Sequence, residues 1–129
     1  MEPAGSRIDL FETALERLEE SLELLKDKSC REYTQFRDSV IQRFEFSFDL
    51  LWKCLRDSIE TDSASPRGVF KDAFLQGLID DFGHKIVLKM LDDRNDSSHR
   101  YDEGMAEEIA HNVYKYHEFM NEIVDRLRK

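Results

Sequence analysis

Apolar residues recur at helical spacing through most of the chain. In about residues 6–28 they step by three or four positions and predict an amphipathic helix behind Ser6 as a candidate N-cap. The stripe consists of Ile8, Phe11, Leu15, Leu18, Leu22 and Leu25. In about residues 31–60 a second stripe predicts a longer helix, with Phe36, Val40, Phe44, Phe48, Leu51, Leu55 and Ile59 on one face.

The second segment also carries apolar bulk away from its main stripe. Ile41, Phe46, Leu50 and Trp52 lie on other faces of the expected helix. A helix in a small bundle does not need apolar side chains nearly all round. Two explanations remain open: this helix lies at the centre of the core, or its second apolar face packs against another copy of the chain.

The second half of the chain predicts two further helices, the first of them broken. A linker at residues 61–68 places Ser65 and Pro66 as the N-cap and first residue of the next helix. Gly77 and residues 80–83 interrupt that helix before it continues to about residue 91. The last helix, from about residue 102 to 128, has the stripe Met105, Ile109, Val113, Tyr116, Met120, Ile123 and Leu127.

Four main helices with short connections predict an all-α fold. We expect an antiparallel up-and-down four-helix bundle with a broken third helix, forming one domain over residues 1–129. The 129 residues include only 5 Gly and 2 Pro, too few turn formers for a β-sandwich or barrel. No apolar run approaches the ~20 residues of a membrane span, and no signal peptide begins the chain, so we expect a cytoplasmic protein without membrane contact.

Charge and cysteine content narrow the classes of function. The formal net charge of −9 disfavours a broad surface for duplex DNA, although a local contact with RNA or a nucleotide remains compatible with it. Cys30 and Cys54 have no Cys or His neighbours at zinc-site spacing, and we expect them as small side chains outside any disulfide. Glu108 and His111 match half of a di-metal bundle motif, but the second half is missing, so no metal is expected.

The most polar stretch, DDRNDSSHRYDE at residues 92–103, lies between two core-forming segments. It contains an R-x4-H-x-Y pattern at Arg94, His99 and Tyr101. In a straight helix Arg94 and His99 would point about 140° apart. They converge only if the helix ends between them, and Ser97 and Ser98 favour such an end because their hydroxyls compete for backbone hydrogen bonds.

An arginine and a histidine at one point suit chemistry on a phosphate. The guanidinium offers a fork of donors to the phosphate, and the imidazole serves as general acid or base near neutral pH. The pair would suit metal-independent cleavage of RNA by its own 2′-hydroxyl. The spacing by itself favours a simpler interpretation, with Arg94 in a solvated ion pair, His99 as a capping or surface residue, and Tyr101 in the core.

Three blocks of sequence resemble one known family. DSVIQRFEFSFDLLWKCL (residues 38–55), SPRGVFKDAF (65–74) and MLDDRNDSSHRYDE (90–103) are similar to the nucleotidyltransferase substrate-binding proteins of the HEPN (higher eukaryotes and prokaryotes nucleotide-binding) superfamily. The resemblance runs from about residue 6 to the end. It implies an up-and-down helical bundle that forms a homodimer, with the polar motifs near the dimer interface, and a complex with a separate minimal nucleotidyltransferase.

The resemblance also implies roles for the polar stretch. Arg94 would bind the scissile phosphate, His99 would act as general acid and base, and Asn95 and Asp96 would orient them. Tyr101 would be the residue that the partner adenylylates. The leading hypothesis is therefore a toxin-like, metal-independent RNase of a toxin–antitoxin pair, without a cofactor. The alternative is a non-catalytic subunit that binds nucleotide or substrate for the transferase, and the third is a structural module whose polar stretch only caps helices.

Overall fold

The computed structural model describes residues 6–99 and 102–129, and for His99 it describes only the backbone. This part of the chain is helical and contains no strand. Its elements are α1 (Arg7–Leu24), α2 (Tyr33–Asp57), α3 (Pro66–Leu75), α4 (Asp81–Asp96), a short 3₁₀ helix η1 (Ser97–His99) and α5 (Glu103–Leu127). The all-helical prediction is confirmed, and the expected broken third helix is two separate helices, α3 and α4.

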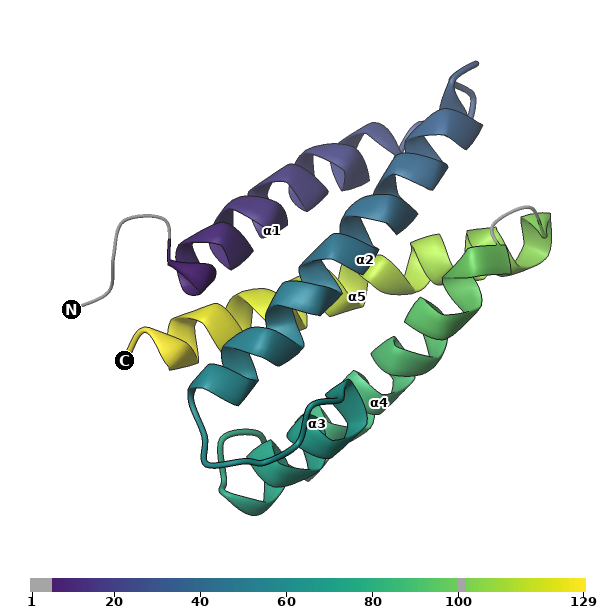
Figure 1. The fold of residues 1–129 in the computed structure, drawn as a ribbon. Coiled ribbons are helices and arrows are strands. Elements are labelled where there is room, and N and C mark those ends of the chain that lie inside the picture. The colour runs from purple at the N-terminus through teal and green to yellow at the C-terminus, as the bar shows by residue number, and fades with distance from the viewer. Residues whose placement is uncertain (1–5, 100–101) are drawn as a thin grey trace.

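Long helices pair lengthwise in the fold. In Figure 1, α2 (blue to teal) runs back alongside α1 (purple), and α5 (yellow-green) starts beside the end of α4 and then packs against α2 and α1. The short helix α3 packs against the end of α2 and against α4. The end of α4 and the start of α5 therefore meet at one end of the molecule, where the polar stretch lies.

Helix α2 is the centre of the core. It contacts α1, α3, α4 and α5. Of the apolar residues outside its main stripe, Ile41, Leu50 and Trp52 are buried within the single chain, whereas Phe46 is 59% exposed. The position of α2 at the centre of the core therefore explains three of these four residues. Of the four, only Phe46 remains to support packing against a second copy of the chain.

The side-chain cap predicted from the sequence forms at the start of α3 but not at the start of α1. Ser65 accepts a hydrogen bond from the Gly68 amide and Pro66 is the first helical residue, as predicted. Ser6 precedes α1 but its side chain makes no capping hydrogen bond to the helix. Gly77 has a φ of 81°, which favours glycine and lets the chain turn from α3 toward α4.

The remaining expectations for the chain concern thiols and the membrane. Cys54 is buried and Cys30 is half-buried, and neither is in a disulfide. Among the helices of residues 6–99 and 102–129, none combines the length and the apolar character needed to cross a bilayer.

Candidate functional site

The polar stretch begins in the last turn of α4. The α-helix ends at Asp96 and a 3₁₀ turn covers Ser97–His99, so the helix ends between Arg94 and His99. This is the break that the sequence requires if the two side chains are to converge. The His99 side chain and Tyr101 lie outside the described residues, and of the predicted site the structure places Arg94, Asn95 and Asp96.

Arg94 is held beside α2. Its Nη2 lies 3.9 Å from Oδ1 of Asp49, and the two side chains are 41% and 44% exposed. An ion pair this exposed contributes at most about 1 kcal/mol, so the guanidinium is available to a stronger anion. The sequence predicted a solvated ion pair for Arg94, and the partner that the structure gives it, Asp49, comes from α2. Asn95 and Asp96 are exposed beside it.

Ser97 links the end of α4 to α2. The residue is completely buried. Its hydroxyl lies within hydrogen-bonding reach of the Glu45 carboxylate and 2.7 Å from the carbonyl oxygen of Arg94. It therefore stabilises the helix end on which the convergence of Arg94 and His99 depends.

Asp93 fastens the same turn to α5. This buried carboxylate accepts hydrogen bonds from the Tyr116 hydroxyl at 2.5 Å and from Nδ2 of Asn112 at 3.1 Å. Burial, and after it the bond to Asp93, raises the pKa of Tyr116 above its ordinary value. Because Asp93 directly precedes Arg94, these two hydrogen bonds fix the position of the backbone from which the Arg94 side chain extends.

The start of α5 is tied to α2 by a buried arginine. The Arg37 side chain is 3% exposed, and its Nη1 lies 2.6 Å from Glu103 and 3.2 Å from Glu107. The Tyr33 hydroxyl donates to Glu107 at 2.9 Å. The hydrogen bond from Arg37 lowers the pKa of Glu103. Burial, and then the bond to Glu107, raises the pKa of Tyr33 to about 12.

Sequence reasoning missed the α2 side of this site. Glu45 and Asp49 had the appearance of ordinary surface charges on an otherwise apolar helix. Their spacing of four residues puts them on one face, about 40° apart, but nothing in the sequence shows that this face meets the end of α4. Arg37 lies within about 20° of Phe44 and Phe48 around the α2 axis, and a charge on this apolar face was a sign of a buried ion pair.

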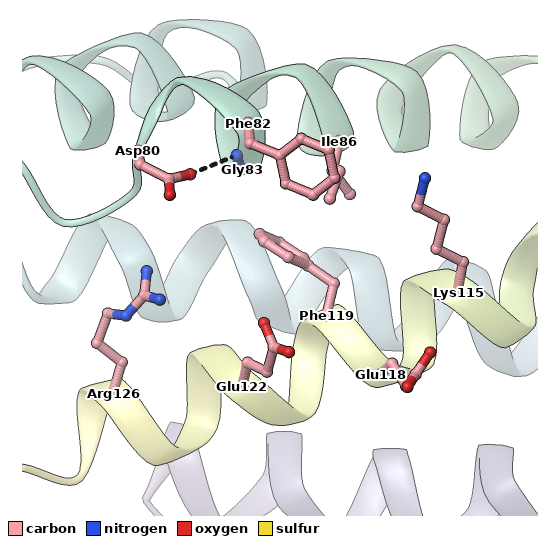
Figure 2. Close-up of a pocket in the computed structure, with 9 residues that line it drawn as sticks. All are labelled: Asp80, Phe82, Gly83, Ile86, Lys115, Glu118, Phe119, Glu122 and Arg126. Atoms are coloured by element: carbon pink, nitrogen blue, oxygen red, sulfur yellow. Dashed lines mark hydrogen bonds between the residues drawn. The ribbon is translucent and has the colours of Figure 1, made fainter.

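A separate cavity lies at the other end of α4. Figure 2 shows its apolar residues Phe82 and Ile86 from α4 facing Phe119 from α5, with Lys115, Glu118, Glu122 and Arg126 along α5. Charges of both signs line it, and Asp80 caps α4 there by accepting from the Gly83 amide at 2.7 Å. It contains none of the predicted site residues. Glu108 and His111 are exposed on α5, and in the described part of the chain no cluster of three or more His, Cys, Asp or Glu side chains is arranged to hold a metal.

Comparison with known proteins decides the family. Residues 6–129 match the family described as nucleotidyltransferase substrate binding protein like. The chain belongs to this family. The match covers α1 to α5 and the whole polar stretch, as the resemblance of the three sequence blocks implied.

Two solved structures share the fold of this family member. A Thermus thermophilus protein, ttk003001694, is 35% identical, with a TM-score of 0.79 over 92% of this chain and 99% of that chain. The Haemophilus influenzae protein HI0074, described as having the fold of a substrate binding domain of a nucleotidyltransferase, is 20% identical, with a TM-score of 0.81 over 95% of this chain and 99% of that chain. No curated protein matches the sequence.

Proposed function

We propose that this chain is the non-catalytic, substrate-binding subunit of a two-component nucleotidyltransferase. The observation that carries the proposal is the family match over residues 6–129. The description of HI0074 as a substrate binding domain of a nucleotidyltransferase supports the same function. In this proposal a separate, minimal nucleotidyltransferase chain supplies the catalytic groups, and the subunit works as the homodimer that the resemblance implies.

Arg94 is the residue that we propose binds the substrate. Its guanidinium is half exposed and is held at the end of α4, where Asp93 and Ser97 fasten the backbone on either side of it. A phosphate dianion is a stronger bidentate partner for a guanidinium than the single, long contact to Asp49. We expect the substrate phosphate to replace Asp49 as the partner of Arg94.

The test uses the full chain co-expressed with a minimal nucleotidyltransferase from the same organism. We expect a stable complex that transfers a nucleotide from a nucleoside triphosphate to its acceptor. Arg94→Ala should weaken acceptor binding by about 10- to 100-fold, the scale of a lost charge-assisted hydrogen bond, while the complex stays intact. Lys89→Gln, an exposed change on the same helix about 140° away, is the control. Absence of any complex would show the proposal to be wrong.

A second candidate is the metal-independent RNase with Arg94 and His99 as catalytic residues. The observation that favours it is the end of α4 at Asp96, between the two residues. The RNA 2′-hydroxyl would attack the phosphorus and the bond to the 5′-oxygen would break, leaving a 2′,3′-cyclic phosphate. His99 would take the proton from the 2′-hydroxyl and return a proton to the 5′-oxygen, while Asn95 and Asp96 orient the pair.

The two candidates separate in a simple assay. The purified full chain is incubated with mixed RNAs in a chelator, beside His99→Ala. Cleavage that His99→Ala abolishes would support the RNase, and intact RNA would leave the substrate-binding subunit. Mass spectrometry of the co-expressed complex adds a second measurement, because an AMP adduct on Tyr101 is expected only if the partner silences a toxin.

A further inference from the structure

The cavity between the start of α4 and the second half of α5 leaves an aromatic ring open to solvent. Phe82 is 64% exposed, whereas the other two apolar side chains of the cavity, Ile86 and Phe119, are each 8% exposed. We call it the Phe82 cavity. Its volume is about 210 Å³. A cavity of ~150 Å³ already admits benzene, so one large apolar side chain of a partner protein would fit here.

The cations at the two ends of the Phe82 cavity contact neutral groups of the chain. The Lys115 Nζ lies 5.7 Å from the centroid of the Phe82 ring. Nη1 of Arg126 donates to the carbonyl oxygen of Leu78 at 3.0 Å. Neither contact neutralises a carboxylate of the cavity. Each contact restricts its cation to one end of the row of charged side chains that Figure 2 shows along α5.

Two carboxylates in the middle of this row have no cation as a partner. In the part of the chain that the structure describes, Glu118 and Glu122 are exposed and form no ion pair or side-chain hydrogen bond. They lie four residues apart on one face of α5, where like charges destabilise a helix slightly. Asp80, the remaining charge of the cavity, caps α4. A partner that brings two cations to Glu118 and Glu122 would therefore be favoured.

The order of charges along α5 disfavours a second copy of this chain as the partner. The row reads positive, negative, negative, positive, at Lys115, Glu118, Glu122 and Arg126. It reads the same in reverse. In a two-fold symmetric contact centred on the row, the same surface meets itself, so the two carboxylates would face those of the other copy. Like charges opposite each other weaken an interface, and a different protein with cations at this position fits better.

The Phe82 cavity and the Arg94 site lie at opposite ends of α4. Phe82 and Arg94 are 12 residues apart on this helix, which corresponds to about 18 Å along its axis. A protein docked at Phe82 therefore leaves the guanidinium of Arg94 open to a substrate. Because a small domain is about 30 Å across, the docked protein would still reach a substrate bound at Arg94.

We propose that the Phe82 cavity is the docking site for the nucleotidyltransferase subunit. A large apolar side chain of that subunit enters between Phe82 and Phe119, and two of its Lys or Arg side chains pair with Glu118 and Glu122. These carboxylates are about 6 Å apart along α5, so cations four residues apart on a helix match their spacing. This proposal rests on the proposed function and names the surface through which its two components meet.

The test measures the affinity between the full-length chain and a minimal nucleotidyltransferase from the same organism, by biolayer interferometry across a salt series. We expect Phe82→Ala to weaken the complex by about 10- to 100-fold, the range of a central apolar contact in an interface. Leu75→Ala is the matched control, because Leu75 is 66% exposed and lies outside the cavity. This control should leave the affinity unchanged.

Charge reversal tests the two carboxylates. Glu118→Lys and Glu122→Lys should each weaken the complex by about 10-fold, mainly by slowing association, and the loss should shrink as salt rises. Glu108→Lys makes the same change in net charge at an exposed position of α5 outside the cavity. A smaller loss in this control separates a local contact from a general effect of charge.

Circular dichroism and urea unfolding establish that each variant is folded before binding is measured. An unchanged affinity in Phe82→Ala and in both charge reversals would overturn the docking site. A change in the oligomeric state of the isolated chain, with the affinity for the transferase unchanged, would also overturn it, because the surface would then belong to a contact between copies of this chain.

The outcomes keep the docking site and the proposed function apart. If the variants leave the complex intact while Arg94→Ala still weakens acceptor binding, the docking site is wrong and the substrate-binding function stands. If the complex depends on Phe82 but the chain binds no acceptor, the docking site stands and the proposed function is wrong. Absence of any complex would overturn both.

Discussion

Two polar connections, one between α2 and α3 and one between α4 and α5, differ in how far along the chain their hydrogen-bonding partners lie. In the first, Thr61 donates to Asp72 at 2.6 Å, and Glu60 and Gln76 bond each other through backbone and side chain. All of these partners lie within 16 residues of one another. The first connection is therefore built almost entirely from its own neighbours in sequence.

The α4–α5 connection is fastened by residues far along the chain. Ser97 reaches Glu45, 52 residues away, and Glu103 binds Arg37, 66 residues away. Asp93 is held from α5 by Tyr116. In the α2–α3 connection the polar groups form hydrogen bonds mainly with one another. In the α4–α5 connection the hydrogen bonds to distant residues position the backbone around Arg94 and leave its guanidinium half exposed. Two stretches of similar polarity therefore differ in what they can offer a ligand.

The largest expected effect comes from removing the buried carboxylate of Asp93, which accepts two hydrogen bonds from α5. Asp93→Ala deprives the Tyr116 hydroxyl and the Asn112 amide of their acceptor inside the protein. We expect a loss of roughly 2–4 kcal/mol in the free energy of unfolding, because buried donors without partners are costly. Urea unfolding measures it. Asp92→Ala, an exposed change next in sequence, should stay within about 0.5 kcal/mol, and an equally small loss for Asp93→Ala would contradict the comparison.

A smaller effect is expected in the local connection. Asp72→Ala removes the acceptor of the Thr61 hydroxyl, but both side chains are only half-buried and water replaces part of the bond. We expect a loss of about 1 kcal/mol by the same urea assay. Asp62→Ala, exposed within the linker, serves as the control. If Asp72→Ala lowered the free energy of unfolding as much as Asp93→Ala, the distinction between local and long-range hydrogen bonds would not hold.

The smallest effect appears at alkaline pH. The pKa of Tyr33 is raised to about 12 by burial and by its bond to Glu107, whereas tyrosines of the unfolded chain ionise from about pH 10. The contribution of Tyr33 is fully present below pH 10 and is lost as the pH rises toward 12, since the unfolded chain loses this proton first. Tyr33→Phe should make the fall in unfolding free energy between these pH values shallower, by roughly 0.3 kcal/mol per pH unit, because Tyr33 is half-buried and solvent screens its interactions. Urea unfolding at several pH values checks this, and parallel curves for the two proteins would refute it.

Local patterns predicted the helices better than their ends. The stripe from Met105 to Leu127 predicted α5 to within about one residue, because caps and periodicity are properties of neighbouring residues. In the first helix the stripe continues to Leu25, which is buried, yet the α-helix ends at Leu24. Asp27 then accepts from the Ser29 amide at 3.0 Å and forms a turn that competes with further helix.

The candidate site divides in the same way. Arg94 and the helix end near Ser97 could be predicted from the sequence, because both depend on residue spacing and on local hydrogen-bonding tendencies. The partners of this turn were not readable. Tyr116 belongs to an apolar stripe and was expected in the core, where it is, but its bond to Asp93 joins two helices and leaves no trace in either pattern.

The sequence by itself determined the all-helical fold, the apolar face of each long helix and the position of the polar break between Arg94 and His99. Each of these depends on the 3.6-residue repeat and on residues within one or two turns. Only the tertiary structure decided that α2 is the central helix, and that its residues Glu45, Asp49 and Arg37 face the α4–α5 connection. The physical reason is that a helix presents its charges on a surface whose neighbour is chosen by the packing of the whole core.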